Sequence, residues 1–203
     1  MKLLNNKTKL LIASHNKGKI KEFKNFFSVK NLDVLSLEKF SNKKPLENGN
    51  TFKSNALIKA KYASSLVNFS IPSLADDSGI CIEKLDYKPG IYSARWAKNN
   101  NYLCAFKKIK KEFEKKKLNM ENQNAKFVCF IAFINTEKKR FFYSGELEGK
   151  LTFPPRGDEG FGYDPIFIPK GYTETLSELN YKIKNKISHR KIAIDKFLND
   201  HYK

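Results

Sequence analysis

The first part of the chain changes its apolar pattern twice. Residues 9–14 form a short apolar run that predicts a buried strand. Ile20, Phe23 and Phe27 then follow at the i, i+3, i+7 spacing of one helix face. Residues 32–37 alternate between apolar and polar side chains, as in a second strand. We therefore expect a strand, a helix and a strand in succession.

The middle of the chain predicts two further helices and a hairpin. Thr51 can cap a helix that carries a narrow stripe of mostly small apolar residues, namely Phe52, Ala56, Ala60, Ala63 and Val67. Tyr102 to Phe113 fits an amphipathic helix with a lysine-rich outer face. Residues 125–134 and 139–152 have strand patterns on either side of 135–138, which predicts a hairpin.

Two adjacent carboxylates interrupt the otherwise apolar segment 71–83. Asp76 and Asp77 are followed by Ser78 and Gly79, residues that simple strand formation does not require. Neighbouring residues of a strand face opposite sides, so the two aspartates are expected to have different roles unless a bulge re-aims them. The alternative is a turn with exposed acids.

The junction between the first strand and the first helix has the composition of an anion site. Residues 14–19 supply hydroxyl, amide, glycine and ammonium groups where the helix begins. Helix N-termini expose unpaired N–H groups that favour anions, so a phosphate would fit there. Ser14 or Asn16 acting as an ordinary helix cap is the alternative.

Two segments near the C-terminus add candidate binding groups. The loop 154–165 concentrates glycine, proline, aromatic and charged residues, which is typical of a binding loop. Phe161 and Tyr163 could present ring faces to a nucleobase, or they could simply pack into the core. Residues 188–190 open a predicted C-terminal helix with hydrogen-bond donors.

Composition leaves the type of partner open. The 203 residues include 39 Lys and Arg against 21 Asp and Glu, a formal net charge of +18. Nucleic acid, an anionic membrane and a small phosphate compound all fit this charge. Only four basic residues are arginines, and the abundance of Lys with Asn resembles a coding bias. A generally solvated lysine surface is therefore favoured over a specific basic groove.

Cysteine usage and hydropathy favour a soluble cytoplasmic protein. The three cysteines are widely spaced and show no CxxC pattern, which supports neither a disulfide framework nor a zinc site. The longest apolar run, 127–134, is far shorter than the roughly 20 residues that cross a bilayer. We expect reduced thiols and no membrane segment.

Six sequence blocks together resemble the inosine triphosphate pyrophosphatase family. Each block alone is weak evidence, but they occur in order over nearly the whole chain. They are Ser14-x-Asn16-x-x-Lys19, Glu47 before Gly49-x-Thr51-Phe52, Ala75 to Gly79, Pro89 to Arg95, Gly160 to Phe167, and Ile187 to Arg190.

The resemblance implies a fold and an activity. The fold would be an elongated, two-lobed α/β fold with a mixed sheet, formed by one domain over residues 1–203, with the active site in the cleft between the lobes. The activity would be Mg²⁺-dependent hydrolysis of noncanonical purine nucleoside triphosphates (ITP, dITP, XTP) between the α and β phosphates, which yields a nucleoside monophosphate and pyrophosphate. Family members are usually homodimers, and no specific nucleic acid partner is expected.

The resemblance also implies roles for individual residues. Glu47 and Asp77 would bind Mg²⁺, and Asp77 would also be the general base. The residues that would hold the triphosphate are Ser14, His15, Asn16, Lys17, Gly18 and Lys19, with a further phosphate contact from Lys59, and Ser78 would touch the substrate. The nucleobase pocket would be lined by Phe161, Gly162, Tyr163 and Asp164, and the base and sugar-phosphate would be contacted by Lys184, His189 and Arg190. Lys184 is chosen among three nearby lysines by counting back from Ser188.

Departures from the family pattern keep alternatives open. Ser54 stands where the family commonly has glutamate, and His15 replaces a small residue. A catalytically weakened, nucleotide-binding relative is therefore one alternative. A basic nucleic-acid-binding protein is another, although it has no need for Asp76, Asp77 and Glu47. The related pyrophosphatases connected with septum formation carry a Ser-Pro-Arg-Arg loop that this chain lacks.

Overall fold

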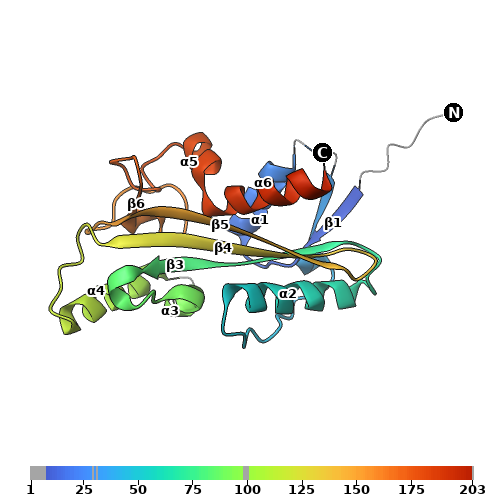
Figure 1. Cartoon of the computed structure of the whole chain (residues 1–203), viewed down its shortest axis with the longest axis horizontal. Helices are drawn as coiled ribbons and strands as arrows, with labels where there is room; N and C mark the ends of the chain where they lie inside the picture. The colour runs from blue at the N-terminus through green and yellow to red at the C-terminus, as the bar shows by residue number, and fades with distance from the viewer. Residues whose placement is uncertain (1–7, 29, 31, 98–100, 203) are drawn as a thin grey trace. The chain divides into compact units, whose positions relative to one another are not determined.

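The computed structural model describes residues 8–28, 30, 32–97 and 101–202. Within them, six strands form one sheet in the order β2-β1-β3-β4-β5-β6 (Figure 1). The strands are β1 (Thr8–Ile12), β2 (Leu32–Ser36), β3 (Ser73–Ile82), β4 (Asn124–Ile134), β5 (Arg140–Leu151) and β6 (Phe167–Pro169). The helices are α1 (Lys17–Phe27), α2 (Phe52–Leu66), α3 (Ser93–Trp96), α4 (Tyr102–Lys115), α5 (Tyr181–Ile187) and α6 (His189–His201).

The sheet is mixed. β1 pairs in parallel with β2, where Leu10 lies opposite Val34, and it also pairs in parallel with β3. β5 and β6 pair antiparallel. The backbone N–H of Asn135 donates to the carbonyl of Lys139 over 3.1 Å, which closes the predicted connection between β4 and β5. The prediction of a mixed-sheet α/β fold is confirmed.

The chain divides into two compact units, each assembled from separated segments. The first unit contains residues 1–77, 130–143 and 194–203, and the second contains 78–129 and 144–193. Strands β3, β4 and β5 and helix α6 each contribute residues to both units. The prediction of one pyrophosphatase domain over the whole chain stays a prediction.

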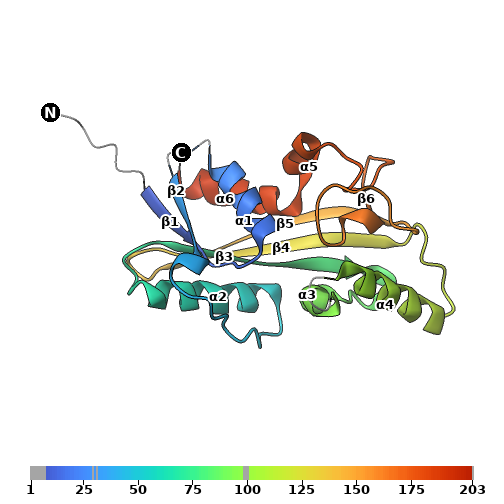
Figure 2. The same ribbon diagram turned by 180° about the vertical axis from the view of Figure 1, so that it is seen from behind.

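In the first unit, helices cover both faces of the strands. Figures 1 and 2 both show α1 on one side and α2 on the other. The predicted stripe of α2 packs inward, because Ala56, Ala60 and Ala63 have no exposed surface. Small side chains let the helix approach the strands closely.

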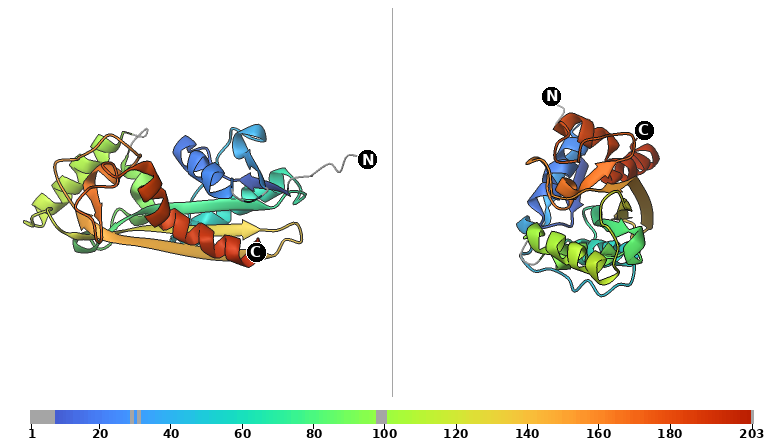
Figure 3. Two further views of the ribbon diagram at one scale, coloured as in Figure 1. Left: turned by 90° about the horizontal axis from the view of Figure 1, so that it is seen from above. Right: turned by 90° about the vertical axis from the view of Figure 1, so that its left-hand side faces the viewer.

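On the other face of this unit, an aromatic cluster joins α1 to the C-terminal helix. The ring of Phe27 in α1 contacts the ring of Phe197 in α6 edge to face, with a centroid separation of 5.9 Å. Phe197 also contacts Phe133 of β4. Figure 3 shows the C-terminal part of α6, in red, running beside the hairpin strands.

The second unit has its own apolar core. Phe106, Ile109 and Phe113 of α4 pack against Ile80 and Ile82 of β3 in one buried cluster, as the amphipathic pattern predicts. Within this unit, α3 and α4 lie on one side of the strands and α5 on the other (Figures 1 and 2). Each unit therefore buries enough apolar surface to hold its own segments together.

At two places the structure decides or adds to what the hydrophobic pattern predicts. The segment around Asp76 and Asp77 is no exposed turn, because both aspartates are buried inside β3 with exposures of 2% and 7%. The hydrophobic pattern does not predict helix α5. It is short and is capped by Asn180, whose side chain accepts a hydrogen bond from the Lys182 backbone.

Among the described helices, none has both the length and the apolar composition that a membrane span requires.

Candidate functional site

The structure shows how the first helix is capped and which charges surround its N-terminus. Asn16 caps α1, because its Oδ1 accepts a hydrogen bond from the backbone N–H of Lys19 over 3.1 Å. Ser14 Oγ in turn accepts from the backbone N–H of Asn16 over 3.1 Å. Asn16, and not Ser14, is therefore the residue that caps α1. The first turn of α1 carries no acidic side chain, so its N–H groups and Lys17 present positive charge.

Two other residues of the same loop are held by neighbouring segments. The Nε2 of His15 donates to the backbone carbonyl of Ser41 at 3.0 Å, which ties the loop to the segment that leads to Glu47. The Nζ of Lys19 donates to the Oδ2 of Asp76 at 2.7 Å, and the Asp76 side chain is only 1% exposed. Asp76 thus fixes the direction of a lysine that the sequence assigns to phosphate binding.

Lys59 connects the two predicted metal ligands. Its Nζ lies 2.8 Å from Oδ1 of Asp77 and 3.2 Å from Oε2 of Glu47. The Lys59 side chain is only 13% exposed, so its ammonium group is largely shielded from solvent. Asp76 and Asp77 bind different lysines, as expected for neighbours on a strand.

Burial and charge shift the pKa values of this cluster. Burial raises the pKa of Asp77 above its ordinary value, although the positive charges of Lys59 and Lys19 oppose the shift. Burial also acts to lower the pKa of Lys59, but attraction to Asp77 and the neighbouring carboxylates outweighs it and raises that pKa. Lys59 therefore stays cationic at neutral pH, and Asp77 is a stronger proton acceptor than an exposed aspartate.

The donor set suits a hard divalent cation. Glu47 and Asp77 each place a carboxylate oxygen on the same ammonium group, so their oxygens converge on a cationic group. Mg²⁺ typically takes one or two protein carboxylates and completes its shell with water and substrate phosphates. The described residues contain no group of three or more His, Cys, Asp or Glu side chains that could form a full protein cage. The residues present therefore fit Mg²⁺.

The second unit contains a buried ion pair beside an aromatic ring. The Nζ of Lys184 lies 2.6 Å from Oδ2 of Asp164, and both side chains are less than 10% exposed. The same Oδ2 accepts the backbone N–H of Phe161 over 2.8 Å, and the ammonium lies 4.9 Å from the centre of the Phe161 ring. Lys182 and Lys186 are exposed, so burial separates Lys184 from its neighbours.

His189 and Arg190 are also held firmly in this unit. The ring of His189 stacks on Phe127 with a centroid distance of 4.9 Å and an interplanar angle of 11°. The guanidinium of Arg190 donates to Ser78 Oγ over 3.0 Å. Both residues are more than 90% buried. Their donor groups are therefore preorganised at the start of α6.

The two aromatic residues of the glycine-rich loop differ in their surroundings. Tyr163 is 3% exposed, and its hydroxyl donates to the backbone carbonyl of Ser93 over 2.8 Å. Its ring meets Tyr102 edge to face. Tyr163 therefore takes the core-packing alternative, whereas Phe161 is only partly buried. Gly160 has a φ of +81°, a conformation that glycine adopts without strain.

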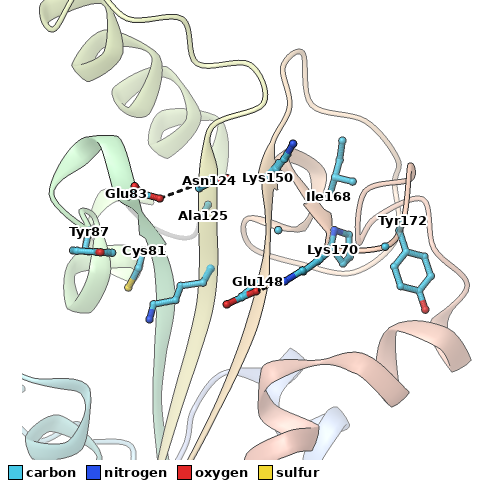
Figure 4. A pocket seen from close by; sticks show the side chains of 14 residues that line it. Cys81, Glu83, Tyr87, Asn124, Ala125, Glu148, Lys150, Ile168, Lys170 and Tyr172 are labelled. Atoms are coloured by element: carbon cyan, nitrogen blue, oxygen red, sulfur yellow. Dashed lines mark hydrogen bonds and ion pairs between the residues drawn. The ribbon is translucent and has the colours of Figure 1, made fainter.

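A separate hollow of about 590 Å³ lies on the second unit and includes none of the predicted site residues (Figure 4). Opposite charges alternate along it, and Lys170 pairs with Glu148 over 2.9 Å. Asn124 donates to Glu83 over 3.1 Å in the same hollow. The lining has mixed charge, with three lysines and two glutamates, and none of the residues that the family resemblance assigns to the triphosphate lies in it.

The predicted residues thus form two groups. The first unit brings together the residues expected to handle phosphates and metal, namely Ser14, His15, Asn16, Lys17, Gly18, Lys19, Glu47, Lys59 and Asp77. The second unit contains the other residues expected to contact the substrate, namely Ser78, Phe161, Gly162, Tyr163, Asp164, Lys184, His189 and Arg190. Asn55 is a further residue of this group that no sequence motif indicated, and its amide donates to Asp77 Oδ2 over 3.3 Å. Its polar side chain beside the apolar stripe of α2 was the available signal.

Fold and site define an α/β protein with a lysine and carboxylate cluster suited to phosphate and a divalent cation. The chain belongs to the Ham1 family, whose model matches residues 10–200. A protein of Oceanobacillus iheyensis named dITP/XTP pyrophosphatase is 43% identical over 190 residues, which cover 92% of this chain and 94% of that protein.

Solved structures agree with this assignment. A HAM1 protein from Coxiella burnetii matches with a TM-score of 0.85 and 33% identity, over 95% of this chain and 98% of that one. The Staphylococcus aureus Ham1 protein matches with a TM-score of 0.81 and 32% identity, over 95% and 97% of the two chains. The family resemblance and the mixed-sheet α/β fold expected from it are therefore confirmed.

Proposed function

We propose that this protein is a nucleoside triphosphate pyrophosphatase that hydrolyses noncanonical purine nucleotides, namely ITP, dITP and XTP. Water would cleave the bond between the α and β phosphates and leave a nucleoside monophosphate and pyrophosphate. The observation that carries the proposal is the convergence of Lys59, Asp77 and Glu47 in a chain whose curated relatives are named dITP/XTP pyrophosphatase.

The phosphate chain would bind to groups of the first unit. The N-terminus of α1 offers backbone N–H groups, and Lys17 and Lys19 add positive charge. Lys59 is a further cation beside Asp77. Lys19 would keep its ion pair with Asp76 and so approach the phosphates from a fixed direction.

Asp77 would accept the proton of the attacking water. Its buried carboxylate has a raised pKa, which makes it a better base than a fully solvated aspartate. Glu47 and Asp77 would hold Mg²⁺, which supplies charge neutralisation at the phosphates when it is bound. Lys59 would hold the position of both carboxylates through its two short contacts.

Selection among purines would depend on donors in the second unit. Hypoxanthine and xanthine carry an oxygen acceptor at the position where adenine carries an amino donor. His189 and Arg190 can supply donors to that oxygen, whereas adenine would leave one of them unpaired. An unpaired buried polar group costs about 1–3 kcal/mol, which is roughly 5- to 150-fold in specificity.

The direct test of the reaction is the identity of its products. Phosphorus NMR of the protein with ITP and Mg²⁺ should show inosine monophosphate and pyrophosphate in equal amounts. Release of inorganic phosphate together with inosine diphosphate would overturn the proposal, because the bond broken would then be the β–γ bond.

The proposal extends to the state in which the protein works. The family resemblance implies a cytoplasmic homodimer. Light scattering of the purified protein should give twice the mass of the 23.5 kDa chain. A monomer with full activity would contradict this part.

A further inference from the structure

Asn55 is the most deeply buried polar residue near the carboxylate cluster, with no exposed surface. It lies in the first turn of α2, directly after Ser54. A buried amide must satisfy its donors and its acceptor within the protein, because an unmade hydrogen bond there is expensive. The partners of Asn55 therefore indicate why the residue is polar.

The two ends of the amide reach two different parts of the candidate site. Its Nδ2 donates to Asp77 Oδ2 over 3.3 Å. Its Oδ1 accepts the backbone N–H of Gly49 over 2.9 Å. Gly49 is two residues from Glu47, so one side chain links the segment that carries one predicted metal ligand to the carboxylate of the other.

The segment that carries Glu47 and Gly49 packs closely against α2. A Cβ atom on Gly49 would collide with Ser54 Oγ and lie 2.7 Å from Asn55 Oδ1. Glycine at position 49 therefore allows the backbone to approach the amide of Asn55. The contact is specific, since a larger residue at position 49 would push the Glu47 segment away from the helix.

Lys59 occupies the opposite side of the Asp77 carboxylate. Lys59 Nζ contacts Oδ1 of Asp77, and Asn55 Nδ2 contacts Oδ2. The two oxygens are therefore each held by one donor, and the carboxylate is fixed in orientation. Lys59 also contacts Glu47 directly, whereas Asn55 reaches it through the backbone at Gly49.

We propose that Asn55 is a positioning residue for the divalent cation: its amide orients the Asp77 carboxylate and anchors the Glu47 segment, so that both ligands are preorganised. This inference rests on the proposed function. Residues that orient metal ligands commonly change metal affinity or activity by about 10- to 100-fold when they are replaced. The same effect is expected for Asn55, although it would not touch the substrate.

The test compares Asn55→Leu, which is similar in volume but has no polar group, with Asn55→Ser, which is too short to bridge the two partners. Ser64→Ala is the matched control, because Ser64 is equally buried in the same helix. Mn²⁺ binding to the nucleotide-free proteins is measured by electron paramagnetic resonance. Thermal unfolding and the steady-state kinetics with ITP and Mg²⁺ are measured on the same samples.

Both Asn55 variants should bind Mn²⁺ about 10- to 100-fold more weakly than the wild type while the control binds normally. In the kinetics, kcat should fall while KM for ITP stays within about threefold, because the phosphate-binding groups of α1 are untouched. A purely structural role would lower the unfolding temperature and leave the Mn²⁺ affinity of the folded protein unchanged.

Mn²⁺ affinity and kcat within twofold of wild type in either folded Asn55 variant would overturn the inference, and so would failure of both variants to fold. Failure of the proposed function has a different signature, since the wild type itself would then release no pyrophosphate from ITP. A wild type that is active but binds no Mn²⁺ would refute the inference alone.

Discussion

Lys59 is the residue on which the charges of the first unit converge. Its ammonium contacts both Asp77 and Glu47, and their attraction outweighs the effect of burial on its pKa. A lysine that would otherwise lie off the apolar stripe of α2 is thereby fixed in place. The same arrangement keeps two carboxylates close together, because the ammonium offsets their repulsion.

Replacing Asp77 by Asn should remove the proton acceptor and keep the shape of the side chain. We expect kcat for pyrophosphate release to fall by about 10²- to 10⁴-fold, the usual contribution of a general base. The unfolding temperature should stay within a few degrees, because burial already disfavours the charged form of Asp77 and Glu47 still faces Lys59. Asp86→Asn, at an exposed position, is the control. Activity near that of wild type in the Asp77 variant would exclude the catalytic role.

The choice of Lys184 over Lys182 is testable in the same way. Lys184→Met leaves the buried Asp164 carboxylate without its cation, which typically costs about 3–5 kcal/mol of stability. The variant should also raise KM for ITP, because the backbone of Phe161 bonds to the same carboxylate. Lys182→Met should change neither quantity, since Lys182 is exposed. Equal effects of the two substitutions in urea unfolding and kinetics would contradict the assignment.

The sequence motifs identified candidate residues, but they did not identify the residues that these contact. The resemblance assigned roles to Lys19 and Asp77 but gave no contact partners, and Lys19 pairs with Asp76, which is 57 positions away along the chain. Asn55 and Asp77 are 22 positions apart. No spacing rule links such partners, because they meet only when a helix packs on the sheet.

The periodicity of apolar residues predicted the long helices and strands, but it did not predict the short helix α5. The apolar positions of α4 and the alternation of β4 and β5 extend over several turns or residue pairs, so the signal accumulates. Helix α5 has only seven residues, three of them lysines, and its burial comes from the Lys184 pair rather than from an apolar stripe. That pairing has no signature in a hydrophobic pattern.

The first turn of α2 explains the most notable departure from the family pattern. Ser54 and Thr51 form a capping box, in which each side chain bonds to the other residue's backbone N–H. Glutamate at this position serves the same purpose in such boxes. Ser54→Glu should therefore leave kcat within about threefold, whereas Ser54→Ala should lose about 0.5–2 kcal/mol of stability. A tenfold rise in kcat on introducing glutamate would instead show that the wild-type site lacks a functional carboxylate.

The C-terminal end of α6 should make stability depend on pH. Burial lowers the pKa of His201 below its ordinary 6.5, although nearby Asp200 opposes the shift. Its ring packs on Phe133 and Phe141, and its Nε2 lies 2.8 Å from the hydroxyl of Tyr143. The unfolded chain therefore binds a proton at a higher pH than the folded protein does. Stability is full above the unfolded pKa and is lost as the pH falls through 6.5 towards the folded pKa.

The variant His201→Gln isolates this effect from the other histidines. Its unfolding temperature should change less than that of wild type when the pH is lowered from about 7.5 to about 5.5, a range that spans the ordinary histidine pKa. Differential scanning fluorimetry at both values gives the comparison. Parallel pH dependences in the two proteins would show that His201 does not contribute.

The net charge of +18 of the whole molecule also fits the alternative function, nucleic-acid binding. A protein that binds nucleic acid through many phosphate contacts loses about 10³- to 10⁵-fold in affinity between roughly 50 and 200 mM salt. Hydrolysis of a small triphosphate at a buried carboxylate cluster depends on a few short contacts instead. Activity on ITP should therefore decline only a few-fold over that range of salt, in a steady-state assay with Mg²⁺ held constant.

The proposed reaction of this protein is the release of pyrophosphate from noncanonical purine nucleotides. The most direct test is pyrophosphate release by the purified protein from ITP, XTP, ATP and GTP, each with Mg²⁺ and with the metal chelated. We predict release from ITP and XTP that requires Mg²⁺, with kcat/KM for ATP at least about tenfold lower because adenine lacks the 6-oxo acceptor. Guanine carries the same 6-oxo group, so a low rate with GTP would have to come from its 2-amino group. Equal rates with all four nucleotides would contradict the proposed base selection, and no release from any of them would contradict the proposed activity itself.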